Sequence, residues 1–199
     1  RKVRMVEESY LRKLFEIHYS DGMGNRRAFG DYDVTVISDY GGFIPPERLD
    51  APFLALSTQT NSTNAGFNLI TKYARADYIV IDEPEARLAA HDRDSPVETV
   101  MRALARGRCE KFVVTHGPHG AYGLEHGEFF HEPTTTDLVR DTMGAGDAFF
   151  AVTAPMAKIG SMRDLLIIGN AAGALKTQIV GHRESVTKDE VIAFLKARP

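Results

Sequence analysis

Four short apolar runs recur along the middle of the chain, and segments compatible with helices lie between or after them. The runs are Val34–Ile37, Phe53–Leu56, Tyr78–Ile81 and Lys111–Val114. Short runs without polar alternation are typical of strands that are buried on both faces. Strands that alternate with helices form a mainly parallel sheet with helices on its faces. The sequence therefore predicts an α/β fold.

The remaining segments extend this pattern. Residues 121–131 alternate like a β-hairpin, and helices are expected at 62–74, 84–90, 96–106, 144–158, 162–179 and 187–197. The first twenty residues fit either a helical stripe or a strand. Ligands of such sheets bind beyond the carboxyl ends of the strands. The loops after Ile37, Ile81 and Val114 are therefore the places to search for a site.

Composition narrows the possible functions. The 199 residues include one cysteine, Cys109, which excludes an internal disulfide and a cysteine-based zinc site and favours a reducing compartment. The net charge of −3 argues against a nucleic-acid binder, whose affinity depends on neutralising phosphates. No run approaches the roughly 18–20 apolar residues of a membrane span, and no apolar signal-peptide core is visible. We therefore expect a cytoplasmic protein that binds neither nucleic acid nor a membrane.

The segment that carries most chemical information is Asp141–Asp147, with the sequence Asp-Thr-Met-Gly-Ala-Gly-Asp. Its glycines precede a predicted helix start, where unpaired N–H groups and the helix dipole favour an anion. An acid beside an anion site makes sense as a base that takes a proton from an attacking hydroxyl. A glycine-rich turn, with Asp141 in an Asx turn and Asp147 as a dipole-favoured acid, explains the same residues without catalysis.

The segment also resembles the C-terminal signature of the PfkB, or ribokinase-like, carbohydrate kinases, with all six fixed positions of Asp-Thr-x-Gly-Ala-Gly-Asp present. The resemblance implies a three-layer α/β/α fold and ATP-dependent phosphorylation of a hydroxyl on a sugar or sugar phosphate. It implies that Asp147 is the general base. The anion hole for the transferred phosphoryl group would be formed by Gly144, Ala145 and Gly146.

Other stretches follow in the order of that family. Glu85, together with Asp82 in place of the family's Asn, resembles the Asn-x-x-Glu motif, which implies Mg²⁺ held directly or through water. An acidic helix N-terminus is the simpler interpretation of this pair. The nucleotide loop of the family is matched by Thr115, Gly117 and Gly120, and Asn170 falls on the helix that flanks the adenine of ATP. A plain glycine-rich turn also explains the loop residues.

The resemblance implies two further features. Asp141, Gly181 and Ser185 fall where many members hold a monovalent cation such as K⁺. Residues 38–41, Ser-Asp-Tyr-Gly, resemble a turn of the heptose-phosphate kinases, although Gly42 and Phe43 replace the Lys and Gly that follow it there.

The N-terminal strands and sugar-binding part of the family are not matched. Residues 1–32 are expected to be a remnant of the sugar-binding and lid part, and residues 33–199 the ATP-binding domain. Because residue 1 is Arg and not Met, the chain is expected to begin within a longer protein, with an exposed sheet edge near its N-terminus. The alternative is a catalytically incomplete nucleotide-binding fragment or a module of a fused enzyme. A homodimer and a fusion to another catalytic domain are both open.

Two other site types compete with this interpretation. A metal site is suggested by four histidines within sixteen residues, namely His116, His119, His126 and His131, but two fall in the nucleotide loop and two at the hairpin. A dinucleotide site could be argued from Gly117, Gly120 and Gly123, whose spacing differs from Gly-x-Gly-x-x-Gly. Neither a Walker motif nor a Gly-x-Ser-x-Gly elbow occurs.

Overall fold

The computed structural model describes residues 2–6, 13–18, 32–41, 44, 46, 49, 51–61, 64, 66–136, 138–181 and 183–197. The chain divides into two units, Arg1–Gly30 and Asp31–Pro199. In the first unit, β1 (Lys2–Val6) and β2 (Lys13–His18) form an antiparallel pair in which Lys2 lies opposite His18. Of the two expectations for this region, the strand is therefore the one that the described residues adopt.

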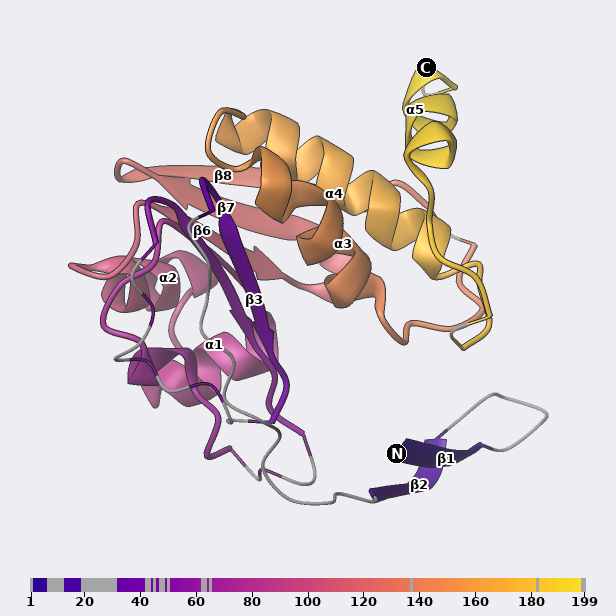
Figure 1. The fold of residues 1–199 in the computed structure, drawn as a ribbon, viewed down its shortest axis with the longest axis horizontal. Helices are drawn as coiled ribbons and strands as arrows, with labels where there is room; N and C mark the ends of the chain where they lie inside the picture. Colours follow the sequence, from indigo (N-terminus) through magenta and orange to yellow (C-terminus); the bar gives the residue numbers. More distant parts are fainter. Residues whose placement is uncertain are drawn as a thin grey trace. The chain divides into compact units, whose positions relative to one another are not determined.

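The second unit is built on a six-stranded sheet with the order β3-β4-β5-β6-β7-β8 (Figure 1). Its strands are β3 (Thr35–Asp39), β4 (Leu54–Thr58), β5 (Tyr78–Asp82), β6 (Lys111–Thr115), β7 (Ala121–Glu125) and β8 (Glu128–Glu132). The first four are parallel, and β7 and β8 add an antiparallel hairpin. The expected mainly parallel sheet is confirmed. β3 stands at one edge and, in the part of the chain that is described, pairs with β4 alone.

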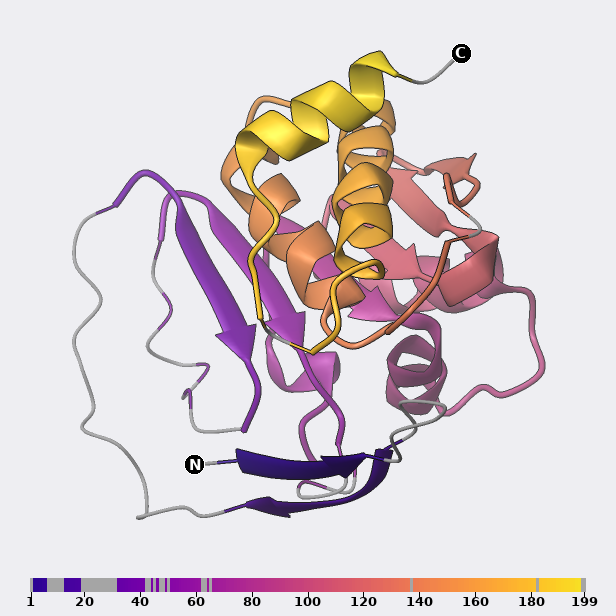
Figure 2. The same cartoon turned by 90° about the vertical axis from the view of Figure 1, so that its right-hand side faces the viewer.

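Helices cover both faces of this sheet. They are η2 (Ile70–Lys72), α1 (Glu83–Ala90), α2 (Val97–Ala105), η3 (Gly117–His119), α3 (Ala145–Thr153), η4 (Ala154–Met156), α4 (Met162–Lys176) and α5 (Lys188–Lys196). α1 and α2 lie on one face, α3 and α4 on the other, and α5 packs against α4 (Figures 1 and 2). No helix among the described residues is long and apolar enough to span a membrane.

Alternation along the buried strands divides the core between the two layers. Ile79 and Ile81 face α1 and α2, whereas Tyr78 and Val80 pack with Phe149 and other residues of α3 and α4. A hydrogen bond between layers accompanies this packing, since the Tyr78 hydroxyl donates to Thr153 Oγ1 over 2.9 Å. The sheet and α3 are therefore fixed to one another by apolar and polar contacts.

The helix expected at 62–74 is wrong for the residues described there, which hold only the short η2. Asparagine side chains bind backbone groups that a helix would use, because Asn64 Oδ1 accepts the N–H of Asn61 and Asn64 Nδ2 donates to Gln59 O. Asn68 Nδ2 also donates to the carbonyl of Asp39, on β3. Gly66 has a φ of +87°, which a helix does not contain.

Two other helices are shorter than expected. The segment 144–158 is α-helical only to Thr153 and continues as η4, where Pro155 cannot donate a helical hydrogen bond. The segment 162–179 ends at Lys176. The remaining helices, α1, α2 and α5, agree with the expected bounds to within one residue at each end.

Candidate functional site

Two acidic side chains meet where β5 ends and α1 begins. Asp82 caps α1 by accepting the N–H of Glu85 over 2.8 Å, and Glu85 Oε2 accepts the N–H of Asp82 over 3.1 Å. Glu85 Oε1 also accepts the N–H of Thr60, from the segment after β4, over 2.7 Å. This capping box fixes both carboxylates at the carboxyl edge of the sheet. The pair thus forms the acidic helix N-terminus that was the simpler interpretation, and metal binding by it stays a prediction.

Burial is the main reason why the pKa values of Asp82 and Glu85 are both raised at this edge. The pKa of Glu85 is raised to about 7, mainly by burial and further by the charges of Asp82 and Asp147. The hydrogen bonds from Thr60 and Asp82 lower the pKa and offset part of this rise. Asp82 lies at the surface, yet surrounding protein atoms exclude enough water to raise its pKa as well. Asp147 thus lies close enough to act on Glu85 although the two are far apart in the sequence. A bound cation would relieve this repulsion.

The N-terminus of α3 has the form of an anion site. Gly144 lies before the helix with a φ of +80°, a conformation suited to glycine, and no side chain caps the helix. Asp147 is exposed on the first turn. The Asp141 carboxylate accepts the N–H of Met143 over 2.9 Å, which is the Asx turn expected for this residue. The general-base interpretation and the glycine-rich-turn interpretation therefore fit the same backbone. They differ only in whether Asp147 takes a proton from a substrate.

The nucleotide-loop residues lie beside this helix start. A Cβ placed on Gly146 would lie 3.9 Å from Thr115 Oγ1, so the end of β6 meets the first turn of α3. Gly117 and Gly120 have φ values of +49° and +85°. A Cβ on Gly120 would stand 2.1 Å from the carbonyl oxygen of Glu132, so only glycine fits there. Gly120 is therefore required by the backbone, whatever the loop binds, whereas a side chain at Gly117 would meet only the strain of a left-handed φ.

Asn170 is placed differently from the other predicted residues. Its Nδ2 donates to the carbonyl of Glu132 over 2.9 Å and to that of Pro133 over 3.2 Å. The amide thus ties α4 to the segment that follows β8. The structure shows Asn170 as an anchor of that segment, and contact with an adenine stays a prediction.

Two of the three residues expected to hold a monovalent cation, Asp141 and Gly181, are already bound to protein donors. Asp141 Oδ1 accepts the N–H of Met143, and Asp141 Oδ2 accepts that of Gly181 over 2.7 Å. The Gly181 carbonyl accepts Nζ of Lys176 over 2.6 Å. Ser185 is exposed. These residues do not fit K⁺, because the Lys176 ammonium at the Gly181 carbonyl would repel a second cation bound to the same oxygen.

Lys176 was missed by sequence reasoning, although one signal for it exists. Lys176 follows Ala172 by four residues and so shares the face of α4 that buries this alanine. A lysine on a buried helical face is rare unless its charge has partners.

Among the described residues, no group of three or more histidine, cysteine, aspartate or glutamate side chains is placed to hold a metal. Asp82 and Glu85 would therefore supply only part of a Mg²⁺ shell, which suits an ion that takes its other ligands from phosphates and water. Two of the four histidines, His116 and His119, have ring centroids 4.6 Å apart, and His131 stacks on Tyr122.

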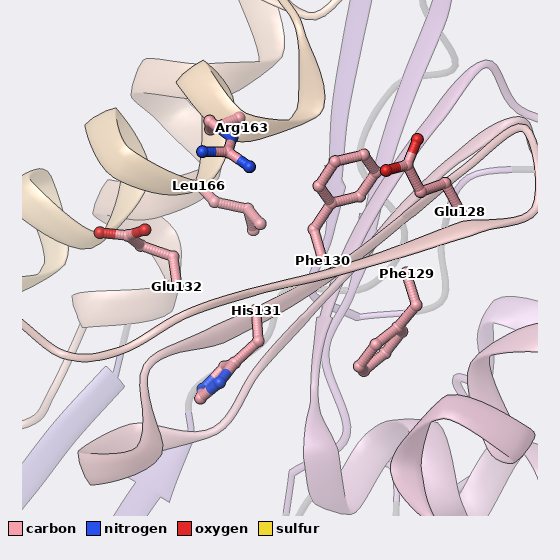
Figure 3. A pocket seen from close by; sticks show the side chains of 7 residues that line it. All are labelled: Glu128, Phe129, Phe130, His131, Glu132, Arg163 and Leu166. Carbon is pink, nitrogen blue, oxygen red and sulfur yellow. The ribbon is translucent and has the colours of Figure 1, made fainter.

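A separate pocket of about 250 Å³ lies between β8 and the start of α4 (Figure 3). Phe130 and Glu128 project toward Leu166 and Arg163 of α4. Gly173 lies beside Ala145, so Arg163, ten residues earlier, is about 15 Å further along the helix. The pocket is therefore distinct from the anion site.

Comparisons with known proteins agree on one family. The model described as "pfkB family carbohydrate kinase" matches residues 62–189. Probable fructokinase-6, chloroplastic, from Arabidopsis thaliana is 30% identical over 158 residues, which are 73% of this chain and 41% of that protein. The chain thus spans about two fifths of the length of that relative.

Solved structures show the same fold. Ribokinase from Thermotoga maritima aligns with a TM-score of 0.66 and 21% identity, over 81% of this chain and 56% of that one. Phosphofructokinase-2 from Escherichia coli in complex with potassium aligns with a TM-score of 0.61 and 18% identity, over 72% and 47%. The expected ribokinase-like fold is confirmed over the aligned part.

Proposed function

The chain belongs to the pfkB family of carbohydrate kinases, and we propose that it supplies the ATP-binding site and general base of a kinase that phosphorylates a hydroxyl of a sugar or sugar phosphate. The observation that carries this proposal is the meeting of three parts at one sheet edge. These are the uncapped N-terminus of α3 with Asp147 on its first turn, the Asp82–Glu85 pair, and the glycine loop after β6.

Each part has a role in phosphoryl transfer. Asp147 accepts the proton of the attacking hydroxyl, and its exposure leaves room for an acceptor sugar. Amides of the segment 144–146 stabilise the charge that develops on the transferred group. Thr115 and the glycines after it hold the nucleotide. Asp82 and Glu85 hold Mg²⁺ directly or through water, and the ion supplies neutralisation of the phosphate charges when bound.

The acceptor is proposed only as a class. The Ser38–Gly41 turn suggests a heptose phosphate or a similar sugar phosphate, and the fructokinase relative suggests a hexose. We propose a cytoplasmic location, with a homodimer or a fused domain completing the sugar site. Because the chain covers 41% of that relative, a nucleotide-binding module without its own acceptor site is the second candidate.

The base is tested by Asp147→Asn in the full-length protein that contains this chain. Turnover, measured as ADP release with a panel of sugars and sugar phosphates, should fall by about 10²–10⁴-fold, while ATP affinity stays within about twofold. The matched control is Asp164→Asn, which alters an exposed first-turn acid on α4. Near-normal turnover in Asp147→Asn would disprove the base. ATP binding without transfer to any acceptor would favour the second candidate.

A further inference from the structure

Lys176 is a buried cation that the proposed chemistry does not use. Its side chain is the last of α4 and is 6% exposed, on the helix that also buries Ala172. Its Nζ donates to the carbonyl of Gly181 over 2.6 Å and to that of Ile179 over 3.4 Å. Among the described residues no carboxylate forms an ion pair with it. The charge is therefore balanced by carbonyl oxygens and by the C-terminus of α4.

Burying an ammonium in this way is costly. A lysine near a helix C-terminus often binds the last carbonyls while its ammonium reaches water. Here the ammonium is enclosed, and an apolar side chain at position 176 would pack with the neighbouring alanines at lower desolvation cost. The contacts of Gly181 indicate what the charge does.

Gly181 connects the ammonium to the anion site. Its carbonyl accepts Lys176, and its N–H donates to Asp141 Oδ2 over 2.7 Å. Asp141 Oδ1 accepts the N–H of Met143, directly before Gly144. The N–H of Asp141 donates to the carbonyl of Thr177, the residue after Lys176. Two independent routes thus join the end of α4 to the loop that opens α3, and the two segments run side by side (Figure 2).

We propose that the ammonium of Lys176 acts as a built-in monovalent cation for this loop. It binds the carbonyl that a K⁺ ion at Asp141 and Gly181 would bind, and so holds Asp141 and the anion site in place without added K⁺. A primary ammonium suits this role because, like K⁺, it carries one charge and binds carbonyl oxygens. Lys176 is a positioning residue in this scheme, which rests on the proposed ATP site.

The first test needs no variant. The melting temperature and the affinity for ATP of the wild-type chain are measured at equal ionic strength in KCl, NaCl and tetramethylammonium chloride. We expect the same melting temperature in all three salts and ATP affinities within about twofold. A melting temperature or ATP affinity that rises specifically with K⁺ would overturn the proposal, because it would show a separate cation site in the intact chain.

The second test removes the ammonium. Lys176→Ala should bind ATP at least about fivefold more weakly in NaCl, and KCl or NH₄Cl should restore both affinity and melting temperature by entering the vacated space. Lys176→Met removes the charge but fills the space, so the same loss should not be restored. Lys158→Ala, at an exposed position, is the control and should match the wild type in every salt.

The outcomes separate the possible failures. A loss in Lys176→Ala that every salt leaves unchanged, or that Na⁺ and K⁺ restore equally, would mean that Lys176 is only a helix cap and would overturn the proposal. A wild-type chain that binds no ATP in any salt would contradict the proposed function, and the melting temperatures would still report on the cation.

Discussion

Gly169 of α4 lies directly against the ring of Phe149 of α3, so that a Cβ at position 169 would stand 2.4 Å from two ring carbons. The phenyl ring is buried among residues of both helices and cannot move aside without disturbing the sheet. This contact fixes the spacing of α3 and α4. It thereby helps to place the first turn of α3, where Asp147 lies.

Gly169→Ala should therefore destabilise the chain by about 1–3 kcal/mol, as overpacking of a core does. Thermal or urea unfolding measures the change. The control is Gly173→Ala, one turn later on the same helix, where a Cβ would meet only Ala145 O at an ordinary 3.6 Å. That variant should be neutral or more stable by up to about 1 kcal/mol, because alanine favours a helix over glycine. Equal effects in the two variants would contradict the argument.

The hydrogen bond between Tyr78 and Thr153 should be measurable by a double-mutant cycle. Tyr78→Phe should cost about 1 kcal/mol, because Thr153 Oγ1 still donates to Phe149 O over 2.8 Å. Thr153→Val should cost about 1–3 kcal/mol, since it leaves the Tyr78 hydroxyl buried and unpaired. The double variant should cost less than the sum of the two. Strict additivity would mean that the two hydroxyls are not coupled.

The raised pKa of Glu85 should appear as a pH dependence of stability. Between about pH 4.5 and about pH 7 the folded chain holds a proton on Glu85 that the unfolded chain has released. The free energy of unfolding should therefore fall as pH rises through this window, with a contribution on the order of 1–3 kcal/mol. Urea unfolding without metal, at about pH 5 and about pH 7.5, measures it.

Glu85→Gln should remove this part of the pH dependence, because glutamine resembles the protonated side chain and retains an acceptor for Thr60. The variant should be more stable than the wild type at about pH 7.5 and similar to it at about pH 5. Glu98→Gln, which changes an exposed glutamate paired with Arg102, should keep the wild-type slope. An unchanged slope in Glu85→Gln would show that Glu85 is ionised in the folded chain throughout this range.

The parallel strands could be predicted because burial on both faces leaves a local signal. Tyr78 and Val80 face one helical layer and Ile79 and Ile81 the other, so the run has no polar position. The segment Asp141–Asp147 could be predicted for a similar reason. Its turn, its left-handed Gly144 and its helix start all depend on residues adjacent in the sequence.

Features that depend on distant partners could not be predicted in this way. The segment 62–74 lacks the expected helix partly because Asn68 binds the carbonyl of Asp39, 29 residues earlier. The spacing of residues places Lys176 on a buried helical face, but nothing local shows that Gly181, which binds it, also donates to Asp141, 40 residues earlier. The anchoring of the loop by Asn170 likewise joins α4 to Glu132, 38 residues away.

The two glycines of the loop after β6 should respond differently to substitution, although both have a positive φ. Gly120→Ala would drive a Cβ to 2.1 Å from Glu132 O and within 2.7 Å of the backbone of Pro133 and Thr134. The segment after β8 would have to move, and Asn170, which holds Glu132, would lose its geometry. We expect a clear loss of stability together with weaker ATP binding.

Gly117→Ala is the matched control, because a Cβ there meets nothing within 4 Å and carries only the strain of a left-handed φ, about 1 kcal/mol. Isothermal titration with ATP and urea unfolding compare the two variants with the wild type. If Gly120→Ala weakens ATP binding strongly while Gly117→Ala does so by less than about fivefold, the nucleotide is bound by backbone groups of this loop, whose positions depend on Gly120. Unchanged ATP affinity in a destabilised Gly120→Ala would instead place the nucleotide away from this loop, because a displaced backbone cannot preserve contacts that it makes itself.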